Sequence, residues 1–158
     1  MAEASAGDDV KFENSKILVV DDNQQNLELV VAYLDTLGCQ VRTAADGLAA
    51  LEEVKKTDFD LILLDIMMPR MSGFEVCRKL KSDPRSRDIP IIMVTALNEL
   101  GDIERGVESG TDDFITKPVN RLELCTRVKS LLRVRHLKNE LDRTLAYLGD
   151  VEGETPSE

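Results

Sequence analysis

Three aspartates, a threonine and a lysine stand where short apolar runs of the chain end. In chain order, these residues are Asp21, Asp22, Asp65, Thr95 and Lys117. Short apolar runs without alternation, next to turn residues, are typical of strands buried on both faces of a parallel sheet. The carboxyl ends of parallel strands share one edge, where ligands bind. We therefore expect three carboxylates, a hydroxyl and an ammonium group to meet at one site.

Clustered carboxylates repel one another unless a cation lies between them. Two unit charges about 4 Å apart cost about 4 kcal/mol at an effective dielectric constant near 20. Oxygen donors without nearby histidine or thiolate suit Mg²⁺, which is usually held by one or two carboxylates and phosphate oxygens. One carboxylate can then act as a nucleophile toward a phosphoryl group. The residue types therefore predict a Mg²⁺-dependent phosphoryl site.

The positions of the aspartates suggest different roles. Asp21 and Asp22 are adjacent after the first strand and are suited to hold the metal ion, whereas Asp65 stands alone and is the better nucleophile. Thr95 and Lys117 would neutralise charge on the phosphoryl oxygens from the other side. Taken singly, each residue also has a simpler interpretation, such as a helix cap, a turn residue or a solvated surface charge. Their common placement at strand ends favours a site.

Strand-like and helix-like segments alternate along the chain from Lys16 onward. Residues with helix-capping patterns, Asp46, Ser72 and Asn120, precede three of the helical segments. Such βα units predict an α/β fold with helices on both faces of a doubly wound, five-stranded parallel sheet. The expected strands lie near 17–20, 41–44, 61–64, 91–94 and 114–116.

Composition argues against several other functions. The chain has 158 residues, of which 42% are hydrophobic, so it can form one domain with a sizeable core. Its net charge of −10 disfavours direct binding of nucleic acid, which depends on Lys and Arg. No run approaches the ~18 apolar residues of a membrane span, and residues 1–15 do not resemble a signal peptide. We expect a cytoplasmic protein that contacts neither nucleic acid nor membrane directly.

The segments around the site resemble the receiver domain of bacterial two-component response regulators, such as those of chemotaxis. The resemblance covers about residues 16–137 and implies a flavodoxin-like fold. The matching stretches are ILVVDD at 17–22, LLDIMMP at 63–69, MSG at 71–73, VTA at 94–96 and DFITKP at 113–118.

This resemblance implies an acceptor and a set of metal ligands. Asp65 would accept a phosphoryl group from the phosphohistidine of a histidine kinase or a phosphotransfer protein. Asp22, Asp65 and the main-chain carbonyl of Met67 would bind Mg²⁺ directly, and Asp21 would act through water. The implied role is therefore that of a phosphorylated signalling domain.

The resemblance also implies three residues that respond to the phosphate. Thr95 would be the hydroxyl that closes on it, Phe114 the aromatic switch residue that turns inward, and Lys117 its cationic partner. The Lys117–Pro118 peptide bond would be cis. The protein would then change its partner-binding surface when it is phosphorylated.

The two ends of the chain are expected to differ from the central domain. We assign residues 1–15 to a flexible acidic tail, 16–137 to the receiver domain, and 138–158 to a helical extension with a disordered C-terminal tail. No output motif is recognisable after Leu137. Gly149 and the polar residues after it are expected to end the last helix.

The last helix, expected over 122–148, is too long for one domain to cover. At 1.5 Å per residue it would extend about 40 Å. Its apolar residues continue to Leu148, and its basic residues, from Arg127 to Lys138, are most simply a solvated face. We expect either a homodimer through this helix, tightened by phosphorylation, or the start of a linker to a further domain.

Two other functions fit this sequence less well. A phosphatase of the haloacid dehalogenase type needs an acidic residue two positions after its nucleophile, where this chain has Met67. A phosphorylation-independent pseudo-receiver scaffold usually lacks an acidic site residue or the lysine, and this chain has all of them. We therefore expect no enzymatic activity beyond self-catalysed phosphoryl transfer and hydrolysis of the resulting acyl phosphate.

Overall fold

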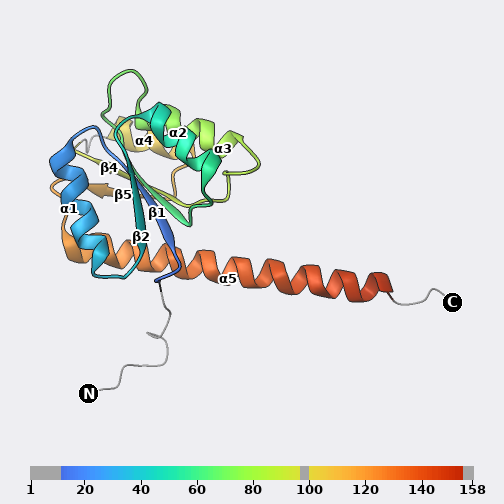
Figure 1. The fold of residues 1–158 in the computed structure, drawn as a ribbon. Coiled ribbons are helices and arrows are strands. Elements are labelled where there is room, and N and C mark those ends of the chain that lie inside the picture. Colours follow the sequence, from blue (N-terminus) through green and yellow to red (C-terminus); the bar gives the residue numbers. More distant parts are fainter. Residues whose placement is uncertain (1–11, 97–99, 155–158) are drawn as a thin grey trace, which may run out of the picture.

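The computed structural model describes residues 12–96 and 100–154. Five parallel strands form one sheet in the order β2-β1-β3-β4-β5 (Figure 1). The strands are β1 (Lys16–Val20), β2 (Gln40–Ala44), β3 (Leu61–Asp65), β4 (Ile91–Thr95) and β5 (Asp113–Thr116). The helices are α1 (Gln24–Asp35), α2 (Gly47–Lys56), α3 (Gly73–Ser82), α4 (Leu100–Ser109) and α5 (Arg121–Glu154). The predicted doubly wound fold is confirmed.

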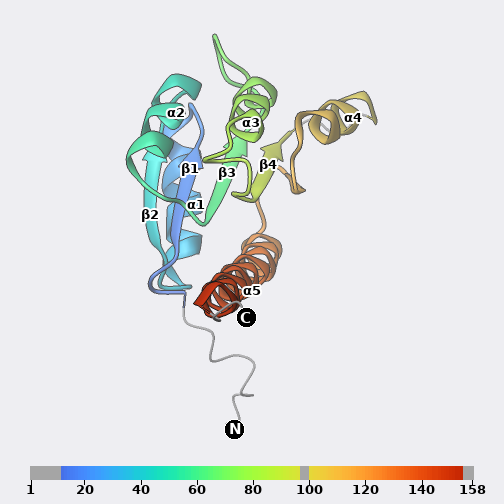
Figure 2. The ribbon, with the colours of Figure 1, turned by 90° about the vertical axis from the view of Figure 1, so that its right-hand side faces the viewer.

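The helices pack around the sheet (Figure 2), and buried apolar side chains form a cluster on each of its faces. On one face, Leu34 of α1 and Leu132 of α5 pack with residues of the strands. On the other, Ala50 of α2 and Leu80 of α3 belong to a second buried cluster. The central strands β3 and β4 are buried along their whole length, which explains their apolar sequences.

The predicted helix caps are present. The side chains of Asp46, Ser72 and Asn120 each accept a hydrogen bond from the backbone N–H three residues later, at 2.8, 3.3 and 3.0 Å. Such bonds satisfy a donor that the first helical turn would otherwise leave unpaired. The caps therefore fix where α2, α3 and α5 begin.

The packed part of the chain begins before Lys16, earlier than predicted. Phe12 is buried among residues of α1, α5 and the strands, although its neighbours in sequence are polar. Ser15 is fully buried, and its Oγ lies 3.1 Å from Nε2 of His136 on α5. The contact joins residues far apart in sequence, so local composition could not reveal it. The remainder of the proposed acidic tail, residues 1–11, lies outside the described residues.

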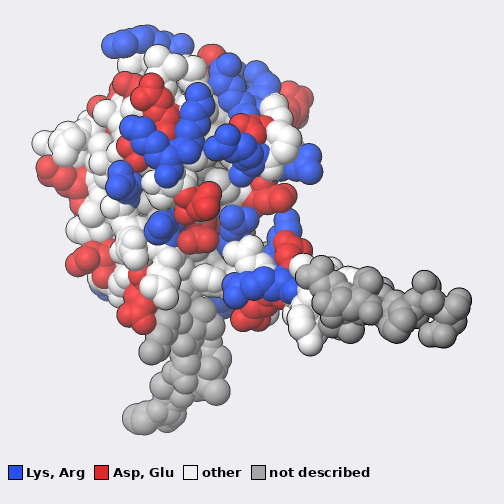
Figure 3. Space-filling view, turned by 45° about the vertical axis from the view of Figure 1, so that its right-hand side comes forward, with Lys and Arg blue, Asp and Glu red and all other residues white. Residues whose placement is uncertain are grey.

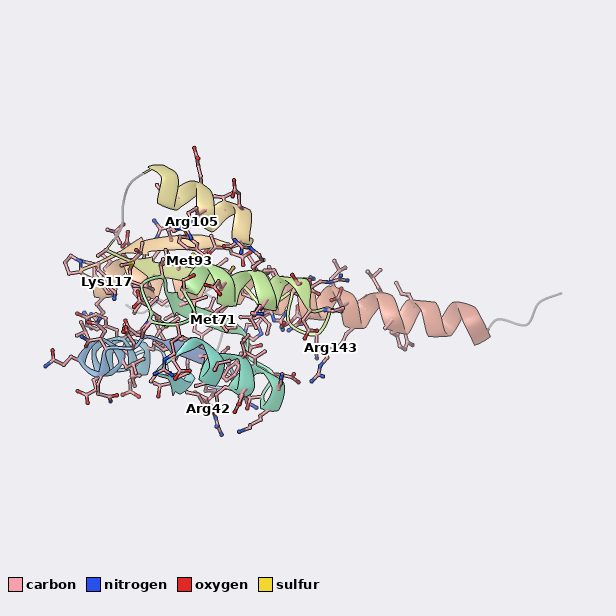
Figure 4. The ribbon with its side chains drawn as sticks, turned by 90° about the horizontal axis from the view of Figure 1, so that it is seen from above. Arg42, Met71, Met93, Arg105, Lys117 and Arg143 are labelled. Carbon is pink, nitrogen blue, oxygen red and sulfur yellow. The ribbon has the colours of Figure 1, made fainter. Side chains whose placement is uncertain are left out.

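The helix α5 is longer than predicted and projects beyond the sheet (Figures 1 and 4). It continues through Gly149 to Glu154, so the predicted end of the helix at Gly149 is wrong. A glycine inside a helix costs about 1 kcal/mol relative to alanine, which is too little to end a long helix by itself. Residues 155–158 lie outside the described part.

Acidic residues at the amino edge of the sheet hold α5 against the body. Arg135 lies 3.8 Å from Asp60, just before β3, and its guanidinium donates to the backbone carbonyl of Asp88 at 3.1 Å. Lys138 forms a second ion pair with Asp88 at 3.3 Å. The interpretation of the basic row as a solvated face is therefore wrong for Arg135, because α5 crosses the sheet edge where Asp60 and Asp88 lie, whereas Lys138 remains 46% exposed.

None of the helices in the described ranges combines the length and the apolar composition that a membrane span requires. Basic and acidic side chains are intermixed on the face of the body seen in Figure 3.

Candidate functional site

Three carboxylates meet at the carboxyl edge of the sheet. Asp21 and Asp22 directly follow β1, and Asp65 is the last residue of β3, which pairs with β1 in parallel register. One carboxylate oxygen from each residue lies within 4.8 Å of the other two. Asp21 and Asp65 are buried, whereas Asp22 is exposed. Adjacent parallel strands thus bring together residues that are far apart in the sequence.

Lys117 reaches this cluster from the loop after β5. Its Nζ lies 3.3 Å from Oδ2 of Asp21 and 3.5 Å from Oδ1 of Asp65. Its backbone N–H donates to the carbonyl of Thr95 at 2.7 Å, which joins the ends of β4 and β5. The Lys117–Pro118 peptide bond is cis, as the sequence resemblance implied. In Figure 4, Lys117 lies at the end of the molecule away from the projecting part of α5.

The carboxyl of Asp65 has a raised pKa. Burial raises its pKa from 3.8 to about 6, and the nearby charge of Asp21 adds to this effect. The ammonium group of Lys117 and the backbone N–H of Met67, which donates to Oδ1 at 3.3 Å, lower the pKa but only partly offset the rise. One lysine therefore leaves the three carboxylates short of positive charge.

Thr95 and Phe114 lie on the side of the site that faces α4. Thr95 is the last residue of β4 and is 3% exposed. Phe114, in β5, is half-buried against the core beneath α2 and α3. Its ring lies against the backbone of Gly106 in α4, so closely that a Cβ at that position would overlap it. Phe114 is thus in direct contact with the neighbouring helix.

The loop after Asp65 has features that the sequence reasoning missed. A Cβ at Gly73, the first residue of α3, would overlap the backbone carbonyl of Asp65, so only glycine allows α3 to start this close to Asp65. Met67 is 61% exposed beside the site. The Ser72–Gly73 pair was visible in the sequence as a helix start, but the close approach to Asp65 was not.

A hollow of about 390 Å³ lies between this loop and α4. The guanidinium of Arg105 in α4 lies 4.4 Å from the centre of the Phe74 ring, at the start of α3, which is a cation–π contact. This contact joins the first turn of α3 to α4. The hollow is lined by Ile66, Met67, Met68, Pro69, Ser72, Phe74 and Arg105.

The chain belongs to the family of response regulator receiver domains, whose family model matches residues 17–129. It is 48% identical to Response regulator PleD of Caulobacter vibrioides over 128 residues, which make up 81% of this chain and 28% of PleD. It is 41% identical over 118 residues to the DNA-binding dual master transcriptional regulator RpaA of Synechocystis, covering 75% of this chain and 49% of RpaA. The chain thus spans less than half of the length of either relative.

Solved structures agree with this membership. The signal receiver domain of a signal transduction histidine kinase from Syntrophus aciditrophicus is 38% identical, with a TM-score of 0.72, and the match covers 76% of this chain and 91% of that one. The chemotaxis protein CheY4 of Vibrio cholerae is 32% identical, with a TM-score of 0.71, covering 74% and 98% of the two chains. The chain therefore has the fold of a receiver domain and belongs to a family of signalling domains.

Proposed function

We propose that this chain is a phosphorylation-controlled switch in a two-component phosphorelay and that Asp65 is its acceptor. A single observation carries the proposal: the buried Asp65 carboxylate lies 3.5 Å from the Lys117 ammonium and within 4.8 Å of the Asp21 and Asp22 carboxylates. Such an arrangement offers a nucleophile, a cation for the phosphoryl oxygens and carboxylates for a metal ion. The proposed donors are a histidine kinase or a phosphotransfer protein in the cytoplasm.

The residues at the site fit Mg²⁺. Their donors are carboxylate oxygens close enough to share one ion, and burial, followed by the negative charge of Asp21, raises the pKa of Asp65. We assign Asp22, Asp65 and the backbone carbonyl of Met67 as direct ligands and Asp21 as a ligand through water. When bound, Mg²⁺ would neutralise charge on the phosphoryl oxygens and keep Asp65 ionised.

The proposed transfer begins with an oxygen of Asp65 attacking the phosphorus of a phosphohistidine. A P–O bond forms, the P–N bond breaks, and its electron pair returns to the imidazole of the donor. Lys117 stabilises the transferring group through its charge, and the hydroxyl of Thr95 donates to a phosphoryl oxygen. The product is an acyl phosphate on Asp65.

The phosphorylated site would then act on α4 through Thr95 and Phe114. Movement of Thr95 toward the phosphate leaves room for the Phe114 ring to turn inward, which changes its contact with Gly106. Because that contact joins β5 to α4, the surface formed by these elements changes with it. Phosphorylation would thus shift a two-state equilibrium at the partner-binding face.

A phosphorylation-independent scaffold is the alternative, and it is supported by no observation of this site. The test is incubation with Mg²⁺ and a small acyl-phosphate donor, followed by intact-mass measurement. The switch predicts the addition of one phosphoryl group, which Lys117→Gln slows and Lys129→Gln, on the helix α5, does not. An unchanged mass in the presence of donor and Mg²⁺ would favour the scaffold.

A further inference from the structure

The second half of α5, residues 134–154, which we call the projecting segment, has an apolar stripe that the body does not cover, although Arg135, His136 and Lys138 near its start still contact the body. The stripe has spacings of three and four residues, so its side chains lie on one side of the helix. The buried Val128 and Leu132 and the anchored Arg135 lie on the other side, toward the body. The stripe consists of Val134, Leu137, Leu141, Leu145 and Leu148, which are 59, 65, 56, 56 and 49% exposed.

Charge is divided unevenly along the same helix. From Leu124 to Lys138 the sequence has five Lys or Arg and no Asp or Glu. From Asn139 to Glu158 it has six Asp or Glu and one Arg. Two copies in parallel would place basic beside basic and acidic beside acidic. Two antiparallel copies would place the basic half of each against the acidic half of the other, so the helix is complementary to itself.

We propose that the projecting segment pairs with that of a second copy of this chain in antiparallel orientation. Pairing about a centre between Leu141 and Leu145 brings Leu141 opposite Leu145 of the second copy and Leu137 close to its Leu148. The interface has two-fold symmetry, so every contact is made twice. The side chain of Lys138 is 46% exposed and forms a surface ion pair with Asp88. In the dimer, Lys138 would lie beside the acidic half of the second helix.

The body of each copy leaves room for this pairing. The body contacts α5 on the side away from the stripe, through Ser15, Asp60 and Asp88. Toward the start of the helix, Ser130 and Arg127 lie four and seven residues before Val134 and line a hollow of about 480 Å³ between β5 and α5. The tip of the second helix points toward this hollow.

The proposed interface lies far from the phosphoryl site. Lys117, at the site, lies at one end of the body, and Arg143 of α5 lies near the opposite edge of the body, from which the helix continues away from the site (Figure 4). Pairing therefore leaves Asp65 accessible, and it goes beyond the proposed function without depending on it. A chain that never accepts phosphate can still pair, and a monomer can still be phosphorylated.

Sedimentation velocity of the full chain over a wide concentration range tests the pairing. We expect a monomer–dimer equilibrium that Leu141→Gln and Leu145→Gln each weaken by about a hundredfold, because each change removes a leucine from both copies and the burial of one leucine contributes about tenfold. The matched controls Leu29→Gln and Leu48→Gln change leucines that are 43 and 60% exposed on α1 and α2, and they should leave the equilibrium unchanged. A monomer at all concentrations, or a dimer insensitive to the α5 changes, would overturn the proposal.

Salt distinguishes the two orientations without any substitution in the apolar stripe. Attraction between opposite charges makes the antiparallel dimer weaken as salt rises, whereas a parallel dimer would strengthen as repulsion is screened. Lys138→Glu should weaken the dimer and reduce its salt dependence, because position 138 lies opposite about position 148, beside the acidic end of the second helix. The control Lys79→Glu makes the same change of net charge at an exposed position of α3 and should have no effect. A dimer that tightens with salt would contradict the antiparallel arrangement.

Discussion

The ring of Phe114 fills the space that a side chain at Gly106 would need, so α4 and β5 meet through a glycine–aromatic contact. Phe114 can lie there only because position 106 has no Cβ. The contact links β5, which pairs with the strand that ends at Thr95, to the helix α4. It is therefore the route by which we expect the acceptor site to influence α4.

Gly106→Ala should force the Phe114 ring or α4 to move. Overpacking of this kind costs about 1–3 kcal/mol, so we expect a lower free energy of unfolding in urea. Gly101→Ala is the matched control, because a Cβ there meets nothing within 4 Å, and alanine should stabilise the helix by up to about 1 kcal/mol. Equal effects of the two changes would show that the contact does not constrain α4.

The raised pKa of Asp65 predicts how stability depends on pH when divalent cations are absent. With a pKa of about 6 in the folded state and 3.8 as its ordinary value, Asp65 keeps its proton in the folded protein after the unfolded chain has lost it. The free energy of unfolding therefore falls as the pH rises through this interval. Asp65→Asn should remove the penalty and stabilise the protein by up to about 3 kcal/mol at neutral pH.

Thermal unfolding with a chelator, at neutral pH and below pH 4, checks this prediction. The gain of Asp65→Asn should be present at neutral pH and absent in acid, where Asp65 is protonated in both states. Asp58→Asn, an exposed aspartate away from the site, should change neither value. A variant less stable than the parent at neutral pH would show that the Asp65 charge is already compensated.

Mg²⁺ should raise the melting temperature because it relieves repulsion among Asp21, Asp22 and Asp65. A hundredfold excess over Kd gives about 2.7 kcal/mol if the unfolded chain does not bind the ion. Asp22→Asn should reduce the shift, whereas Asp58→Asn should not. If the melting temperature stays constant in millimolar Mg²⁺ while phosphorylation proceeds, the assignment of the metal site is wrong.

Met67→Asn should shorten the lifetime of the acyl phosphate several-fold. Met67 is 61% exposed two residues after the acceptor, where an apolar side chain cannot orient water and shields the phosphoryl group. An asparagine offers hydrogen bonds to an attacking water molecule. Release of phosphate from purified, labelled protein measures the rate, with Met71→Asn as a control in the same loop. A rate equal to or slower than the parent's would place the control of water access elsewhere.

Much of this fold was visible in local sequence, because the signals for strands and caps are local. Asp46, Ser72 and Asn120 cap their helices through backbone groups three residues away, and such pairs can be recognised directly. The meeting of Asp21 and Asp65 was predictable because parallel strands align their carboxyl ends. The sequence was sufficient here because residues at the carboxyl ends of neighbouring parallel strands lie together at one edge of the sheet.

The parts that could not be predicted depend on contacts between distant residues. Phe12 and Ser15 belong to the core through α5, and Arg135 is held by Asp60, more than seventy residues earlier. The fit of Gly106 to Phe114 depends on how closely α4 approaches β5. Only the packed structure reveals these relationships.

The central claim, that Asp65 accepts the phosphoryl group, is tested most directly by locating the modification. The protein is treated with an acyl-phosphate donor and Mg²⁺, reduced with borohydride so that an aspartyl phosphate becomes homoserine, and mapped by peptide mass spectrometry. We predict homoserine at position 65, its loss in Asp65→Asn, and its retention in Asp58→Asn. Homoserine at position 21 or 22, or undiminished phosphoryl incorporation in Asp65→Asn, would contradict the account.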